Sequence, residues 1–174
     1  MLKHELIAAV RARTPVDDWE KACIEEFLAE LDRLGDELFD EHANPVHVTA
    51  TALIVGARGI VLHRHKVLAT WIAPGGHVDP GETPADAVVR EAGEETGMIV
   101  GHFDGVPNLV HVDVHLGLRG HTHLDLRYLL DGGDAEPAPP PDESQDVAWF
   151  TWDEALAITE PHMKGIIRHL STLR

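Results

Sequence analysis

Cysteine is almost absent from this 174-residue chain, in which Cys23 is the single example. One cysteine excludes an intrachain disulfide. Long apolar runs are missing as well, and none approaches the length of a signal-peptide core or a membrane span. These two absences together predict a cytoplasmic protein without a membrane partner.

Basic residues are scarce. The chain has 14 Lys and Arg residues and 30 Asp and Glu residues, which give a formal charge of −16. Such a balance argues against a broad, nonspecific grip on nucleic acid or on an anionic membrane. A polyanionic substrate would need metal ions at the binding site to neutralise its negative charge. The charge therefore favours a small-molecule substrate and makes nucleic acid an unexpected partner.

The length leaves no room for a second full domain, and no internal repeat is apparent. Residues 2–42 are rich in Glu, Asp, Leu and Ala and predict helix with a break near Thr14-Pro15. Asn44-Pro45 then marks the change to β-branched sequence. We predict a helical N-terminal extension over residues 1–44 and the main domain over residues 45–174. The apolar stripe of the extension could pair across a homodimer.

The main domain alternates between strands and helices. Predicted strands cover residues 46–55, 59–65, 68–72, 99–103, 109–116, 122–130 and 147–151, and predicted helices follow at 152–158 and 161–173. Residues 132–144 contain Pro137, Pro139, Pro140 and Pro141 and predict a stiff polar loop. The pattern indicates an α/β fold.

The stretch of residues 76–98, GHVDPGETPADAVVREAGEETGM, contains a short helix that Thr83 and Pro84 begin and Gly97 ends. At about 100° per residue, Glu91, Glu94 and Glu95 fall within one arc roughly 100° wide. The apolar side chains form a separate face, made of Ala85, Val88, Val89 and Ala92. Clustered acid in the last turns of a helix opposes the helix dipole, so a cation is expected to compensate. Carboxylate oxygens are ligands that suit Mg²⁺ or Mn²⁺, which often also contact a substrate phosphate.

This stretch resembles the Nudix box, in which a glycine, a glutamate and an R-E-U-x-E-E-x-G-U run recur at fixed spacing, where U is a bulky aliphatic residue. The matching residues are Gly76, Glu82, Arg90, Glu91, Glu94, Glu95 and Gly97. Ala92 departs from the pattern, being small where the family prefers Leu, Ile or Val. The resemblance implies a Nudix fold, an α/β/α sandwich around a mixed sheet, over about residues 46–156. It also implies a metal-dependent enzyme that cleaves the pyrophosphate linkage of a nucleoside diphosphate derivative with water.

The resemblance also assigns roles to single residues. Glu91 and Glu95 are the strongest metal-ligand candidates, Glu94 is a third ligand or acts through water, and the Gly76 carbonyl could complete the shell. Either Glu94 or the loop residue Glu143 could be the general base, so the catalytic candidates are Glu91, Glu94, Glu95 and Glu143. In the family, the positions of Glu82 and Arg90 form an ion pair that holds the loop against the helix.

A second polar face is predicted on two neighbouring strands by the strand period of two. Its members are His111, Asp113, His115, His121, His123, Asp125 and Arg127. A hairpin centred on Leu118 would pair His115 with His121, Asp113 with His123 and His111 with Asp125. This face is interpreted either as a floor that contacts substrate or a transition metal, or as a solvated sheet surface. We favour the solvated surface, because hairpin register is weakly encoded in one sequence.

Two other functions compete with hydrolysis. A Nudix-fold sensor would bind a nucleotide derivative without cleaving it, although such a protein has no need of a costly acidic cluster. An isoprenoid diphosphate isomerase of the same fold relies on a catalytic cysteine, whereas Cys23 lies in the N-terminal extension. Sugar nucleotides, dinucleotide cofactors, ADP-ribose, noncanonical nucleoside triphosphates and capped RNA all present a diphosphate, and the sequence carries no readable code to separate them.

Overall fold

A computed structural model describes residues 2–35 and 37–173 of the chain. The helices are α1 (Lys3–Arg11), α2 (Asp18–Arg33), α3 (Pro84–Thr96), α4 (Trp152–Ile158) and α5 (Pro161–Ser171). The strands are β1 (Val46–Gly56), β2 (Gly59–Arg64), β3 (Trp71–Ile72), β4 (Gly75–His77), β5 (Leu109–Leu116), β6 (Thr122–Asp131) and β7 (Val147–Phe150). Short 3-10 turns occupy Phe103–Gly105 and Leu118–Gly120.

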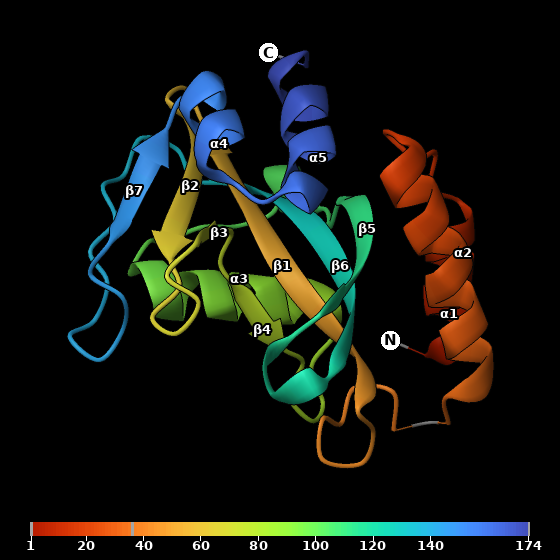
Figure 1. Cartoon of the computed structure of the whole chain (residues 1–174). Helices are drawn as coiled ribbons and strands as arrows, with labels where there is room; N and C mark the ends of the chain where they lie inside the picture. The colour runs from red at the N-terminus through yellow and green to blue at the C-terminus, as the bar shows by residue number, and fades with distance from the viewer. Residues whose placement is uncertain (1, 36, 174) are drawn as a thin grey trace.

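A seven-stranded mixed sheet forms the centre of the molecule (Figure 1). Its main order is β3-β2-β1-β6-β5, with β4 paired to β1 and β7 paired to β2. The long strand β1 runs parallel to β6 over its whole length and antiparallel to β4 near its beginning and to β2 near its end. As a result, β1 lies between β4 and β6, which brings together strands that are distant in sequence.

Alternate residues of β1 pack against different helices, as the strand period of two requires. Ala50, Ala52 and Ile54 belong to the core cluster that includes Val88 and Ala92 of α3. Leu53 and Val55 instead join the cluster formed with α4 and α5. The sheet is therefore covered by α3 on one face and by α4 and α5 on the other, which is the predicted sandwich (Figure 1).

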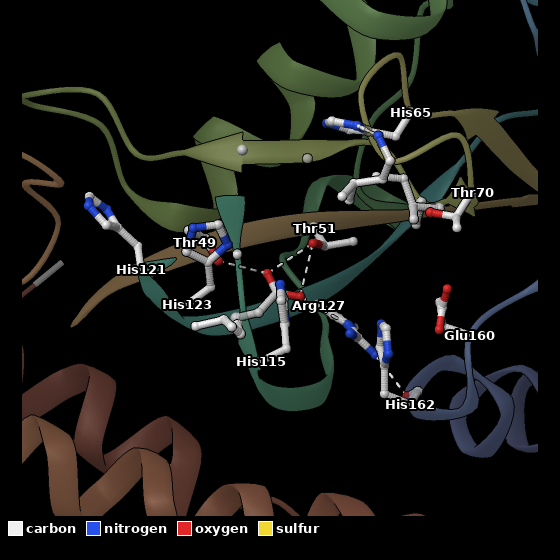
Figure 2. Close-up of a pocket in the computed structure, with 18 of the residues that line it drawn as sticks. Thr49, Thr51, His65, Thr70, His115, His121, His123, Arg127, Glu160 and His162 are labelled. Carbon is white, nitrogen blue, oxygen red and sulfur yellow. Dashed lines mark hydrogen bonds and ion pairs between the residues drawn. The ribbon is translucent and has the colours of Figure 1, made fainter. Parts of the chain in front are cut away.

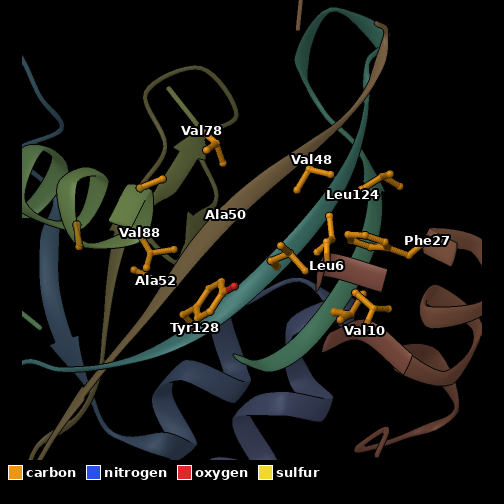
Figure 3. Close-up of a cluster of buried hydrophobic side chains, with 14 of the residues drawn as sticks. Leu6, Val10, Phe27, Val48, Ala50, Ala52, Val78, Val88, Leu124 and Tyr128 are labelled. Carbon is orange, nitrogen blue, oxygen red and sulfur yellow. The ribbon is translucent and has the colours of Figure 1, made fainter. Parts of the chain in front are cut away.

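The N-terminal helices lie along β5, the strand at one edge of the sheet (Figure 1). The amide of Val112 in β5 donates to the buried Glu20 carboxylate at 3.0 Å, so α2 satisfies part of the strand edge. Leu6, Val10 and Phe27 are fully buried against β1 and β6 residues such as Leu124 (Figure 3). Much of the apolar stripe that the sequence offered to a dimer, including Phe27 and Leu31, is thus buried within the chain, whereas Trp19 is 49% exposed.

Four sequence predictions need correction. The strand predicted over residues 68–72 is shortened to Trp71–Ile72, which form β3. The second N-terminal helix ends at Arg33, and residues 37–39 and 41–43 form turns. Residues 99–103 form no strand, and Gly101 makes only an isolated bridge to Asp131. The Gly75–His77 segment, which lies outside the predicted strands, is strand β4 and pairs with β1. For β4, pairing with the distant strand β1 decides the outcome rather than local propensity.

Helix α3 begins and ends where the sequence predicts. Thr83 and Asp86 form a reciprocal capping box at its start, with Pro84 as the first helical residue. Gly97 ends the helix with φ of 66°, a left-handed conformation that glycine adopts without strain. A Cβ at this position would overlap the Ala138 carbonyl, so the proline-rich loop packs directly on the helix end. None of the helices in the described ranges has the length and apolarity needed to cross a membrane.

Candidate active site

The carboxylates of Glu91 and Glu95 extend from α3 toward the backbone of β4. Glu95 accepts a hydrogen bond from the Gly75 amide at 2.9 Å. Glu91 lies so close to Gly76 that a Cβ there would stand 2.7 Å from its Oε1 atom. Because glycine has no side chain at this position, the Glu91 carboxylate can approach the strand backbone.

Both carboxylates are mostly shielded from solvent, with side chains 17% exposed for Glu91 and 18% for Glu95. Burial raises the pKa of Glu91 above its ordinary range. Burial raises the pKa of Glu95 to about 8, the Gly75 amide opposes this, and the charges of Glu91 and Glu143 add to it. Without a cation, the ionised forms of both groups are therefore disfavoured.

Arg90 connects the loop before α3 to the acidic residues on it. Its guanidinium donates to both oxygens of Glu82, at 2.9 and 3.2 Å from Nε, and to the His77 carbonyl at 3.0 Å. It also contacts Glu91 at 2.9 Å and Glu94 at 3.2 Å. The hydrogen bond and charge of Arg90 lower the pKa of Glu82. The geometry ties the 79–83 loop, β4 and α3 into one unit.

The two candidates for the general base lie in different surroundings. Glu94 has a side chain 58% exposed, held by Arg90 on the outer side of the helix. Glu143 lies on the loop before β7, where Lys66 contacts its carboxylate at 3.1 Å. The charge of Glu143 contributes to raising the pKa of Glu95 and opposes the lowering of the pKa of His63.

His63 was not among the sequence-derived site residues, although the 63–66 cluster of two histidines, an arginine and a lysine was noticeable. Its ring is buried, and its Nε2 atom lies 3.6 Å from Glu95. Neither ring nitrogen has a hydrogen-bond partner within the described chain. Burial lowers the pKa of His63 to about 4, so the ring is neutral at pH 7. Side chains of β2 alternate between the two faces of the sheet, and this alternation directs residue 63 inward. That pattern is the signal by which the sequence could have identified His63.

A cavity of about 640 Å³ opens beside β4 and extends across one face of β1, β6 and β5 (Figure 2). Gly75 and Gly76, which the carboxylates of Glu95 and Glu91 approach, form part of its lining. Its wall combines apolar side chains, such as Ile72 and Met163, with many imidazoles. His115 and His162 stack with ring centroids 5.7 Å apart, and they stand side by side in Figure 2. This volume is in the range of small-molecule sites.

The predicted His/Asp face is present, but its register is different. His115 pairs with His123, Asp113 with Asp125 and His111 with Arg127, two residues from the predicted pairing. The hairpin turns at Leu118–Gly120 with Arg119 at φ of 63°, and the Gly117 amide donates to the His121 carbonyl. The centre of the hairpin is therefore residue 119 rather than 118. A shift of two residues keeps every side chain on its predicted face.

The interpretation of this face as a solvated surface is wrong for four of its members. His111, Asp113, Asp125 and Arg127 are no more than 2% exposed. Arg127 contacts Asp113 at 2.6 Å and Asp125 at 3.0 Å. Burial alone would raise the pKa of Asp113, but Arg127 and hydrogen bonds from His115 and Trp19 hold it well below its usual range.

The two aspartates of this network have further partners, whereas the buried Nε2 atom of His111 has none among the described residues. Thr51 donates to Asp125 at 2.9 Å and Thr49 does so at 3.2 Å. Trp19 of α2 donates to Asp113 at 2.8 Å. Burial and the neighbouring Arg127 lower the pKa of His111. These buried members link β1, β5, β6 and α2, and two of them, Asp125 and Arg127, line the cavity together with His115, His121 and His123.

The carboxylate site has the donor chemistry that suits a divalent cation of the Mg²⁺ class. Two mostly shielded carboxylates with raised pKa values face a glycine backbone. Among the described residues, Arg90 provides a positive charge in contact with Glu91. A cation at this place would reverse the cost of ionising both groups. Glu94, by contrast, needs a side-chain rotation away from Arg90 to join them.

Comparison with known proteins gives a consistent result. A family model described as the NUDIX domain matches residues 45–170. A Lactococcus lactis protein named probable DHNTP pyrophosphohydrolase is 24% identical over 134 residues, which cover 75% of this chain and 80% of that protein. The crystal structure of a NUDIX-family hydrolase from Clostridium perfringens has a TM-score of 0.64 at 24% identity, covering 74% of this chain and 98% of that one.

The N-terminal helices also have a structural counterpart. The crystal structure of a UDP-X diphosphatase aligns with 99% of this chain and 93% of its own, with a TM-score of 0.58 and 19% identity. At that identity the likeness concerns the fold alone. It extends the similarity beyond the matched domain to α1 and α2.

Proposed function

Since this chain belongs to the NUDIX family and is a hydrolase of phosphoanhydride bonds, we propose that it cleaves the pyrophosphate linkage of a nucleoside diphosphate derivative with water and Mg²⁺ or Mn²⁺. One observation carries the metal assignment. Glu91 and Glu95 bring two buried carboxylates with raised pKa values against the glycine backbone of β4, at the edge of the cavity.

Glu91, Glu95 and the Gly76 carbonyl would hold the cation, with Glu94 as a further ligand after it leaves Arg90. When bound, a divalent cation neutralises phosphate oxygens and lowers the pKa of a coordinated water. Arg90 and Glu82 keep β4 and α3 in a fixed relation, so Glu91 and Glu95 need no reorganisation when substrate arrives. The group beyond the diphosphate would occupy the cavity along β1 and β6.

Glu143 is the better candidate for the general base. Lys66 contacts its carboxylate at 3.1 Å and can orient it, and its charge contributes to the raised pKa of Glu95. Glu94 is largely exposed and occupied by Arg90. A base on the 132–146 loop could accept a proton from water without giving up a place among the metal ligands.

Comparison of Glu143→Gln with Glu94→Gln distinguishes these roles. We expect Glu143→Gln to lower kcat by roughly 10²–10⁴-fold with little change in KM, as for removal of a general base. Glu94→Gln should mainly raise the Mg²⁺ concentration needed for half-maximal rate. The measurement is kcat, KM and Mg²⁺ dependence for both variants on one substrate. A large kcat loss in Glu94→Gln alone would exchange the two roles.

A product-resolved screen tests the proposed activity as a whole. Sugar nucleotides, dinucleotides, ADP-ribose, nucleoside triphosphates and capped RNA should be incubated with Mg²⁺ and separately with Mn²⁺. The expected result is metal-dependent release of a nucleoside monophosphate from at least one small substrate, with capped RNA poorer. Tight binding of a compound without hydrolysis would support the sensor instead. Preferred cleavage of capped RNA would overturn the small-molecule assignment.

A further inference from the structure

Three imidazoles from three different strands meet at one end of the cavity. They belong to His47 of β1, His77 of β4 and His123 of β6, and one nitrogen from each lies within 4.8 Å of the others. Sheet pairing explains the convergence. His47 is the register partner of His123, and His77 pairs with Thr49, one step along the same face of β1. The cluster therefore depends on β1 lying between β4 and β6.

The orientation of His47 suits a metal ligand. Its ring is fully buried, and Nδ1 lies 3.0 Å from the Asn44 carbonyl. A carbonyl can only accept, so Nδ1 carries the hydrogen and Nε2 presents a lone pair. That Nε2 atom stands 3.1 Å from the Nε2 atom of His77. Two nitrogens bound at 2.0–2.1 Å to a tetrahedral ion would be about 3.3 Å apart, close to this separation.

The third ring is held in place from the other side. A Cβ at Gly117 would overlap the His123 imidazole, so this glycine makes the space that the ring fills. The ring centroids of His47 and His123 are 5.1 Å apart, and those of His77 and His123 are 5.7 Å apart. Glu41 adds a carboxylate 3.4 Å from the His77 Nε2 atom at the rim. The ligand types are those of a borderline transition metal, unlike the all-oxygen set on α3.

We propose that His47, His77 and His123 bind a transition-metal ion of the Zn²⁺ class, at a second site separate from the α3 carboxylates. Three protein ligands leave a coordination position open toward the cavity, where a water, Glu41 or an oxygen of a bound ligand can enter. Without metal, the His47 and His77 nitrogens share one N–H···N hydrogen bond. The site adds a metal to the cavity wall and does not depend on whether α3 supports hydrolysis.

Titration of tag-free, chelator-treated protein with Co²⁺ and Zn²⁺ tests this proposal. The expected result is one ion per chain by calorimetry, with the visible absorption of four-coordinate Co²⁺. His47→Gln and His77→Gln should each weaken binding by roughly 100-fold or more, beyond the 10–100-fold typical of lost outer-shell partners. The matched control is His169→Gln on the exposed face of α5, which should bind like the wild type. The double variant Glu91→Gln/Glu95→Gln should also keep the ion.

Several results would overturn the assignment. Unchanged binding in both histidine variants would do so, as would loss of the ion in the double glutamate variant, because the ion would then belong to α3. If His47→Gln does not fold because His47 is buried, two other variants test the site. These are His77→Gln, at a partly exposed position, and Gly117→Ala, which displaces the His123 ring. A further result would assign the cluster to an anion and not to a metal. In that case the metal-free protein would bind inorganic pyrophosphate, His77→Gln would lose this binding, and no Co²⁺ site would be found. Mg²⁺-dependent hydrolysis by His77→Gln is measured separately, so the histidine metal site and the proposed hydrolysis can each fail without the other.

Discussion

Replacing Glu95 with glutamine is expected to reduce Mg²⁺-dependent hydrolysis by roughly 10²–10³-fold or more, the loss typical when a group that stabilises transition-state charge is removed. The fold should remain, because the glutamine carbonyl can accept the Gly75 amide that Glu95 accepts at 2.9 Å. Glu91→Gln should behave similarly. The control is Glu26→Gln on the exposed face of α2, which removes one charge far from the site.

The same substitution should change the pH dependence of stability in metal-free protein. Burial raises the pKa of Glu95 to about 8 from an ordinary 4.5. A raised carboxyl pKa stabilises the folded state fully below pH 4.5, and this contribution is lost as pH rises through 8. Metal-free Glu95→Gln should therefore gain stability relative to the wild type between pH 4.5 and 8. Each unit of pKa shift corresponds to about 1.4 kcal/mol.

Thermal unfolding at several pH values, with and without Mg²⁺, measures this difference. Mg²⁺ should raise the Tm of the wild type at pH 8 and raise that of Glu95→Gln much less, because the cation binds the ionised carboxylate. Full hydrolytic activity in Glu95→Gln, or an equal Mg²⁺ effect on both Tm values, would remove Glu95 from the metal site.

Replacing Arg127 with methionine is expected to cost about 3–5 kcal/mol of unfolding free energy, the loss typical when one partner of a buried ion pair is removed. Arg127 is 2% exposed and contacts Asp113 at 2.6 Å and Asp125 at 3.0 Å. Methionine fills much of the volume but leaves two buried carboxylates without a counter-charge. Because Asp113 also accepts from Trp19, the packing of α2 on the sheet should loosen as well.

Urea unfolding gives the free energy for this variant and for Arg33→Met. Arg33 forms an exposed pair with Glu30 on α2 and has a side chain 73% exposed, so its loss should cost under about 1 kcal/mol. A similar small cost for Arg127→Met would mean that the buried network contributes nothing beyond packing. Combining Arg127→Met with Asp113→Asn should recover part of the loss, since one unpaired charge disappears.

Local sequence determined the parts of the site that lie on one element. Helix α3 begins and ends at the predicted residues, and the positions of Glu91, Glu94 and Glu95 around it follow from helix geometry alone. The alternation of β5 and β6 likewise determined which side chains share a face. These features depend on spacing within a single helix or strand, so they can be read without knowing what packs nearby.

Features that join separate elements could not be read in this way. The register of the β5–β6 hairpin depended on the turn that the chain adopts at residues 118–120, and a two-residue shift leaves the polar pattern unchanged. Nothing in the pattern distinguished a solvated Arg127 from one buried between two aspartates. That difference arises because α2 and α5 cover this part of the sheet.

The sequence by itself thus determined the acidic helix, its glycine-containing lead and the family to which the chain belongs. Tertiary structure alone decided that His63 approaches Glu95, that Lys66 contacts Glu143, and that histidines 47, 77 and 123 gather at one point. The physical reason is that period and capping act within an element over a few residues. Strand order and burial are set by the free energy of the whole chain, which only the packed sheet minimises.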